Sequence, residues 1–376
     1  MNSFLLLCQS LSVLRKETAH PEIEAALSSA ASLQAVIDLA DQEMLAPALW
    51  LALQHKGLAD RLSDETRQAL RRRYQMNALL NERIREEADH VAELCRSIGV
   101  TPAALKGGAF LYEADPASIG ARAMRDLDFL VPPDALEAVA RAMMERGYRI
   151  KPGEDEDWNY TYPGLERPGG LVAIELHQYV GQQRCLLVPQ MVWPDVRMLE
   201  GSNGRVACLS PAHRVWHNIF HSQVQDRGHL FGLVWLRQLH DLVEIVGRHG
   251  HEIDWQQLLE LFDTQGLAHV FKARLYQAHV LLGLEWPLAQ PPGFREKFHH
   301  RHCLTLIRLS PAMWLTRFWA AVTAPLKKYH IDLLYECGTD RVFPLLACRL
   351  RHTLKVMGKY RGSLMSRLWE RREFDV

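Results

Sequence analysis

Strand-forming sequence is concentrated between residues 100 and 180, and the rest of the chain spaces its apolar residues as helices do. Runs such as "AALSSAASLQAVIDLA" repeat apolar residues every three or four positions, which is the period of a helix face. Two short apolar runs, "LDFLV" and "LVAIELHQYV", are instead rich in residues typical of strands. Because strand candidates are few, the sequence predicts an α+β protein with a small mixed β-sheet core, flanked by N-terminal and C-terminal helical regions.

The distribution of these runs predicts four regions along the chain. The segment 64–99 resembles one long helix, which Asp64 would cap and Gly99 would end. Helical spacing returns at Ser210, and Ser210 followed by Pro211 is a favourable N-cap and first helical residue. We therefore expect the following division: an N-terminal helical region over 1–98, an α/β core over 99–200, a helical domain that completes a cleft over 201–290, and a basic, partly helical region over 291–376.

The charges of the whole chain balance, but their distribution along the chain is uneven. Lysine plus arginine and aspartate plus glutamate both number 44, so no overall charge favours nucleic acid or a membrane. From residue 291 onward there are roughly 16 basic and roughly 7 acidic residues, which is typical of a solvated helical surface and also agrees with an anionic partner.

The cysteines and the apolar runs indicate a cytoplasmic protein. Seven cysteines are scattered without a CxxC pair, which is typical of buried, reduced thiols rather than a disulfide framework. The run "MNSFLLLCQSLSVLRKE" has no basic residue before a short apolar stretch, so it predicts an amphipathic helix and not a signal peptide. No stretch of about 18 apolar residues occurs, so we expect no membrane span.

Three carboxylates fall on the two strand candidates. Asp126 and Asp128 are two residues apart at the head of "LDFLV", so both would leave the same face of a strand. Glu175 lies between Ile174 and Leu176, and would join them if the two strands are neighbours. Carboxylates held this close repel one another unless a cation separates them, and oxygen ligands suit Mg²⁺. The sequence therefore predicts a magnesium site, and three carboxylates could hold the two ions used in displacement at phosphorus.

The segment before these carboxylates carries the features of a phosphate site. Gly107 and Gly108 lack a Cβ and could let a phosphate approach the backbone at the start of a helix. Lys106, Arg122 and Arg125 could neutralise a triphosphate. Together with the carboxylates they predict a site for a metal-bound nucleoside triphosphate (NTP).

The order "LKGGAFLY", "ARAMRDLDFLV", "GYR" and "VAIELH" resembles the DNA polymerase beta-like nucleotidyltransferase superfamily, and more closely its uncharacterised bacterial nucleotidyltransferase family. The resemblance covers roughly residues 80–250 and implies a nucleotidyltransferase core with a small mixed sheet. It also implies that Asp126, Asp128 and Glu175 bind metal, that Lys106, Gly107 and Gly108 form the nucleotide-binding turn, and that Arg122 contacts phosphate. The superfamily commonly has Gly-Ser at that turn, whereas this chain has Gly-Gly and no serine hydroxyl.

Five further residues are candidates for the cleft or for metal. His213, His217 and His221 are spaced to share one helix face, which agrees with packing at a helix interface and also with zinc or with lining a cleft. His221 and Asp241 resemble positions of the narrower family, so we expect both near the cleft. His177 would share a strand face with Glu175 and could orient a carboxylate or contact the acceptor.

These patterns predict a Mg²⁺-dependent enzyme that transfers a nucleoside monophosphate from an NTP to a hydroxyl or similar nucleophile. The acceptor would be a peptide, a protein or a small molecule, and a nucleic acid is less favoured because the α/β core lacks a basic stripe. Two alternatives remain: a transferase that uses a nucleotide sugar to modify peptides, and a weakly active module that binds nucleotides or partners.

Overall fold

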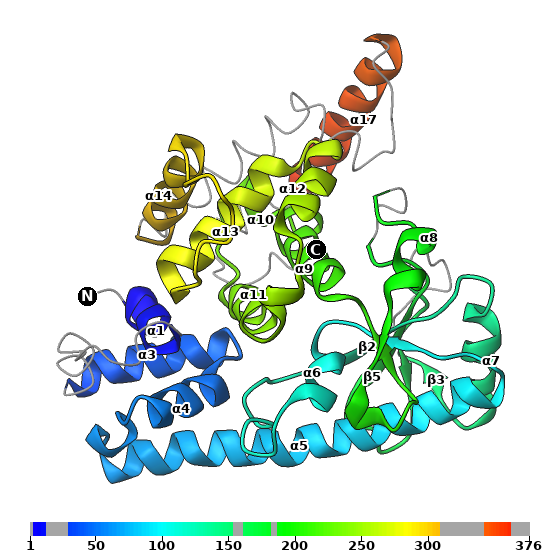
Figure 1. Cartoon of the computed structure of the whole chain (residues 1–376), viewed down its shortest axis with the longest axis horizontal. Helices are drawn as coiled ribbons and strands as arrows, with labels where there is room; N and C mark the ends of the chain where they lie inside the picture. Colours follow the sequence, from blue (N-terminus) through cyan, green and yellow to red (C-terminus); the bar gives the residue numbers. More distant parts are fainter. Residues whose placement is uncertain (1–2, 13–28, 153–160, 182–185, 309–341, 362–376) are drawn as a thin grey trace. The chain divides into compact units, whose positions relative to one another are not determined.

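The computed structural model describes residues 3–12, 29–152, 161–181, 186–308 and 342–361 (Figure 1). Within these residues, seven strands form one mixed sheet with helices before and after it, which confirms the predicted α+β class. The helices are α1 (Ser3–Leu11), α3 (Ala30–Gln42), α4 (Ala46–His55), α5 (Asp64–Ser97), α6 (Gly107–Glu113), α7 (Leu136–Glu145), α8 (Pro189–Val192), α9 (Pro211–Ile219), α10 (Gly228–Phe231), α11 (Leu236–His249), α12 (Trp255–Thr264), α13 (Ala268–Leu282), α14 (Phe294–Arg308) and α17 (Val342–Arg361). The strands are β1 (Ala103–Ala104), β2 (Asp126–Leu130), β3 (Arg149–Ile150), β4 (Leu165–Glu166), β5 (Ala173–His177), β6 (Arg197–Met198) and β7 (Ala207–Cys208).

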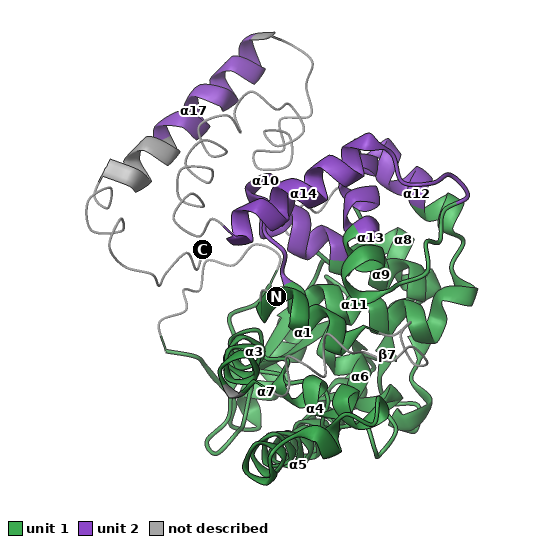
Figure 2. Cartoon of the chain, turned by 90° about the vertical axis from the view of Figure 1, so that its left-hand side faces the viewer, with its two compact units in different colours: residues 1–218, 236–258, 277–288 green, residues 219–235, 259–276, 289–376 purple. Residues whose placement is uncertain are grey.

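The chain divides into two compact units, coloured separately in Figure 2. Unit 1 comprises Met1–Asn218, Leu236–Leu258 and Gln277–Leu288, and it contains the whole sheet. Unit 2 comprises Ile219–Trp235, Leu259–Tyr276 and Ala289–Val376. The four-region division expected from the sequence stays a prediction.

The two longest strands lie side by side at the centre of the sheet, in the order β3-β4-β5-β2-β1-β7-β6. β2 and β5 are parallel, and β1 is antiparallel to β2 and parallel to β7. Leu127 and Phe129 of β2 and Ile174 and Leu176 of β5 are fully buried in the core cluster. Because strand side chains alternate, the polar residues between them share the opposite face.

The core behind the sheet is completed by α5 and α7. Figure 1 shows α5 as the long helix that passes α6, β5 and α7, and it contacts α6 and α7. Its buried residues Ile84, Ala88 and Val91 recur at helical spacing and belong to the same cluster as the strand residues. The apolar side of the sheet is thus covered, which leaves functional side chains to the other face.

The ends of α5 follow from local sequence, with one correction. The N-cap is Ser63, whose hydroxyl accepts a hydrogen bond from the Thr66 amide at 3.3 Å, so the expectation that Asp64 caps the helix was wrong. Serine and aspartate are both good N-cap residues, and here Ser63, one residue earlier, takes the N-cap position. Asp64 then lies in the first turn of the helix, where a negative charge interacts favourably with the helix dipole. Gly99 has φ +77°, a left-handed conformation that suits glycine and ends the helix as expected.

Two asparagines of α5 hold the loop between α6 and β2. Asn77 donates to the Gly120 carbonyl at 2.8 Å, and Asn81 donates to the carbonyls of Ile119 at 2.6 Å and Arg122 at 2.9 Å. Both asparagines are buried, so these bonds replace hydrogen bonds to water. The loop that carries Arg122 is therefore held in place by hydrogen bonds from α5.

The cysteines depart from the expectation at one position. Cys8, Cys95, Cys208 and Cys303 are buried free thiols, and burial raises the pKa of Cys208 to about 11. Cys348 is disulfide-bonded, so the expectation of reduced thiols throughout was wrong there. Pairing depends on the distance between Cα atoms, which the spacing of cysteines in a sequence does not reveal. Among the described residues, no helix is both long and apolar enough to cross a membrane.

Candidate active site

The register between β2 and β5 brings the predicted carboxylates together. Asp128 lies directly opposite Glu175, and Asp126 lies two residues earlier on the same strand face. The Asp128 side chain is only 2% exposed, whereas that of Glu175 is 34% exposed. One carboxylate is thus anchored inside the protein while its neighbour reaches solvent.

His177 joins this pair from β5. Its Nε2 lies 2.8 Å from Oδ1 of Asp128 and 3.6 Å from Oε2 of Glu175. Burial alone would lower the pKa of His177, but hydrogen bonds to the two carboxylates raise it above its ordinary value. His177 thus lies next to both carboxylates, and its role, to orient a carboxylate or to contact the acceptor, stays a proposal.

Lys106 approaches Asp128 from the turn between β1 and α6. Its Nζ donates to Oδ1 of Asp128 at 2.9 Å. Burial would lower the pKa of Lys106, and the carboxylates of Asp128 and Asp126 raise it above its ordinary value. Burial would likewise raise the pKa of Asp128, but Lys106 and His177 hold it well below its usual range. The backbone of Lys106 has φ +44°, which is strained for a residue with a Cβ and is typical of functional sites.

The donor set fits a divalent cation. Among the described residues, Asp128, Glu175 and His177 can each offer a ligand atom, and these atoms lie within 4.8 Å of one another. Burial and the neighbouring carboxylates of Asp128 and Glu175 raise the pKa of Asp126, so negative charge is crowded on this face. A cation here would relieve that repulsion. The set differs from the predicted ligands by including His177, and a ligand role for Asp126 stays a proposal.

The two glycines of the turn face different neighbours. A Cβ added to Gly107 would lie 2.6 Å from Sδ of Met124 and 2.7 Å from Cζ of Arg122, and still closer to Nη1 of Arg122. A Cβ added to Gly108 would instead lie 3.0 Å from Cβ of Ala104 and 3.2 Å from Cδ1 of Leu127. Gly107 thus makes room for an arginine and Gly108 for helix-to-sheet packing, and their role in nucleotide binding stays a proposal.

The arginines form a cationic group beside the carboxylates. Arg122 makes two hydrogen bonds to Asp241 of α11, from Nε at 2.9 Å and from Nη2 at 2.8 Å. Arg237, also on α11, donates to the Ala123 carbonyl at 2.6 Å. Arg237 thus contacts the residue that follows Arg122, and burial and the nearby Arg122 guanidinium lower the pKa of Arg237. Arg125, next to Asp126, is exposed.

The expected histidine face is interrupted. His213 and His217 lie in α9 and are buried, which agrees with packing. His221 lies in the π-helical turn Phe220–Gln225, where the spacing per turn changes, so the three histidines do not continue one α-helical face. His221 belongs to unit 2 and lies 3.1 Å from an Asp226 carboxylate oxygen, and its place in the cleft stays a proposal.

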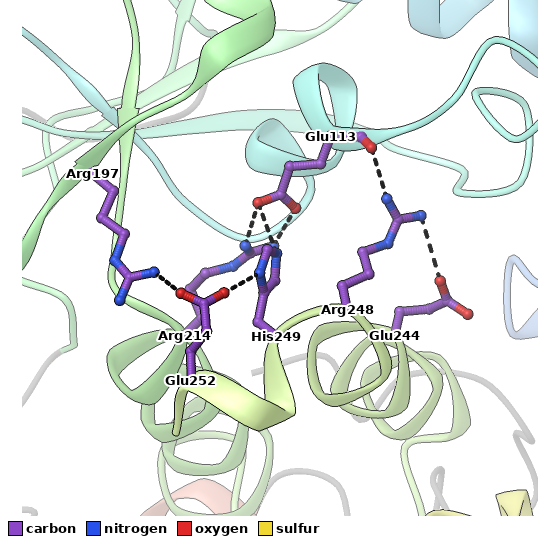
Figure 3. A network of polar contacts seen from close by, with 7 residues as sticks. All are labelled: Glu113, Arg197, Arg214, Glu244, Arg248, His249 and Glu252. Carbon is purple, nitrogen blue, oxygen red and sulfur yellow. Dashed lines mark hydrogen bonds and ion pairs between the residues drawn. The ribbon is translucent and has the colours of Figure 1, made fainter. Parts of the chain in front are cut away.

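A network of ion pairs fastens α6 to α9 and α11 (Figure 3). Glu113 at the end of α6 binds Arg214 at 2.5 and 2.9 Å and lies 3.3 Å from Nε2 of His249. Its backbone carbonyl accepts a hydrogen bond from Arg248 at 2.7 Å. Because Asp241 and Arg237 lie on α11, this network also positions the residues that hold the Arg122 loop.

Sequence reasoning missed Arg237, Asn77 and Asn81 as parts of this arrangement. The asparagines had a readable signal, since two asparagines four residues apart are unusual in the interior of an otherwise strong helix former. No sequence signal marked Arg237, because an arginine on a helix is ordinarily exposed to solvent.

Comparison with known proteins agrees with the geometry. The profile of a family described as "Uncharacterised nucleotidyltransferase" matches residues 29–283, about two thirds of the chain. The match confirms the resemblance to the uncharacterised nucleotidyltransferase family. Searches of curated proteins and of solved structures return no match.

Proposed function

The chain belongs to the uncharacterised nucleotidyltransferase family, and on that premise we propose that it transfers a nucleoside monophosphate from an NTP to a hydroxyl or similar nucleophile, with Mg²⁺ at the β2–β5 face. The observation that carries the proposal is the register of Asp128 with Glu175, joined by His177 on the same face. A buried carboxylate beside a partly exposed one, with cations adjacent, suits a metal-bound polyphosphate.

The residues that would hold Mg²⁺ are the carboxylates of Asp128 and Glu175, with Asp126 on the same face, and His177 would orient these carboxylates. Bound Mg²⁺ would neutralise charge on the triphosphate and favour ionisation of the attacking oxygen. Lys106 already donates to Asp128, so it lies next to the position where phosphate oxygens would collect. Arg122, Arg125 and Arg237 supply further positive charge beside that position.

The reaction is a displacement at the α-phosphorus. A bond forms between the acceptor oxygen and the α-phosphorus, the bond from that phosphorus to the bridging oxygen of the β-phosphate breaks, and pyrophosphate leaves. The acceptor proton passes to a carboxylate, and Glu175 is the best placed because Asp128 is committed to Lys106 and His177.

Isotope position in the donor tests this function. The protein is incubated with Mg²⁺, a pool of peptides, proteins and metabolites, and ATP, GTP, CTP or UTP labelled at either the α- or the γ-phosphate. We expect label from the α-phosphate, and none from the γ-phosphate, to appear on an acceptor. Transfer of γ-label would contradict the proposal.

One further donor, and the absence of any transfer, separate the alternatives. Transfer of a labelled hexose from a nucleotide sugar would favour the peptide-modifying alternative. Absence of transfer from every donor by the folded protein would favour the binding module.

A further inference from the structure

Asp241 and Arg122 form a partly buried pair that joins two distant parts of unit 1. The residues are 119 positions apart, and their side chains are 18% and 15% exposed. Two parallel hydrogen bonds to one carboxylate fix the plane of the guanidinium as well as its position. Arg122 is therefore oriented by α11, not by its own loop alone.

Gly107 supplies the surface on which this arginine rests. The space that a Cβ of Gly107 would fill is taken by Cζ and Nη1 of Arg122 and by Sδ of Met124. The guanidinium thus lies against the first residue of α6, directly after Lys106. The sequence predicted that the absence of a Cβ at Gly107 would let a phosphate approach the backbone. In the structure, this absence makes room for the Arg122 guanidinium.

The backbone around Arg122 is held by α5 and, a second time, by α11. Asn81 of α5 donates to the Arg122 carbonyl at 2.9 Å, and Arg237 of α11 donates to the Ala123 carbonyl at 2.6 Å. Arg122 and Arg237 are like charges in a partly buried place, and Asp241 provides the nearby negative charge that makes the pair tolerable. The cations are thereby held together before any anion binds.

We propose that Asp241 is a positioning residue that holds Arg122 against Gly107, so that Arg122 is preorganised to bind the polyphosphate of the donor. This inference rests on the proposed function and extends it. Preorganisation raises affinity because the ordering of the side chain occurs on folding and not on binding. Asp241 acts through Arg122 and makes no contact with the phosphate itself.

The test is calorimetric binding of inorganic tripolyphosphate, with Mg²⁺, to wild type, Asp241→Asn, Arg122→Lys and the double variant. Asp241→Asn removes a negative charge, so simple electrostatics would strengthen anion binding. Positioning predicts the reverse, a loss of about tenfold, comparable to the low end of the effect of removing an outer partner of a metal ligand. The double variant is expected to bind no more weakly than Arg122→Lys alone, because both changes act on one residue.

Several outcomes would overturn the inference. Unchanged or tighter binding by Asp241→Asn would show that the carboxylate only competes with phosphate for Arg122. Additive losses in the double variant would show that Asp241 acts independently of Arg122. If Asp241→Asn does not fold, Asp241→Glu retains the charge, and it should bind tripolyphosphate more weakly than wild type.

The same data separate this inference from the proposed function. If wild type binds tripolyphosphate with the predicted coupling but transfers no nucleotide, the inference stands and the proposed function fails. If folded wild type binds neither tripolyphosphate nor any NTP, both fail.

Discussion

Replacing Asp128 by asparagine is expected to weaken Mg²⁺-dependent NTP binding by at least about a hundredfold. Removal of a residue that only supports a metal ligand already lowers metal affinity about 10- to 100-fold, and Asp128 is a proposed ligand. The same change should also destabilise the protein. Lys106 and His177 both bond Oδ1 of Asp128, which is 2% exposed, and the neutral amide leaves the Lys106 ammonium without its ion-pair partner. A partly unsatisfied buried group costs about 1–3 kcal/mol. Thermal unfolding in EDTA should therefore show a lower Tm.

The matched control is Asp126→Asn, the same change on the same strand face. Asp126 is crowded by the carboxylates of Asp128 and Glu175, which, with burial, raise its pKa. Removing its charge should leave the Tm in EDTA unchanged or higher, while Mg²⁺-dependent NTP binding still falls. Equal losses of Tm in both variants would contradict this assignment of partners.

Gly107→Ala is expected to give the second large effect. The added methyl group would occupy the space of the Arg122 guanidinium and of Sδ of Met124. The arginine must move, which breaks its paired hydrogen bonds to Asp241 and removes a cation from the polyphosphate position. We expect a loss of about 1–3 kcal/mol of stability, as for overpacked interiors, and calorimetry should show NTP binding weakened by about tenfold or more.

Gly108→Ala is the adjacent control. Its methyl group would meet Cβ of Ala104 and Cδ1 of Leu127 at 3.0 and 3.2 Å, contacts that a shift of a few tenths of an ångström relieves. The variant should keep NTP affinity within about threefold and lose less than about 1.5 kcal/mol of stability. Stronger loss of affinity at Gly108 than at Gly107 would favour the original expectation that Gly108 contacts the nucleotide.

Local patterns predicted much of the fold and the centre of the site. The alternation in "LDFLV" and "VAIELH" places apolar residues on one face and carboxylates on the other, so a parallel register was enough to bring Asp128 opposite Glu175. The long helix over 64–97 and the Ser210–Pro211 start of α9 likewise follow from periodicity and capping.

Contacts between distant segments could not be predicted in this way. The partner of Arg122 is Asp241, 119 residues away, and nothing local to either residue indicates the pairing. The positive φ of Lys106 also has no sequence signal, because lysine is not a residue type that is enriched at positive φ, as glycine and asparagine are. The π-helical turn Phe220–Gln225, which contains His221, likewise has no signal in the periodicity of the sequence.

Calorimetric titration of ATP, GTP, CTP and UTP, with Mg²⁺ and with EDTA, into wild type and Glu175→Gln tests the central claim most directly. Glu175 is partly exposed, so its neutral replacement should leave the fold intact. We expect at least one NTP to bind wild type only with Mg²⁺, and Glu175→Gln to lose that binding. Folded wild type that binds no NTP, or a variant that binds as well as wild type, would contradict a metal-dependent nucleotide site on β2 and β5.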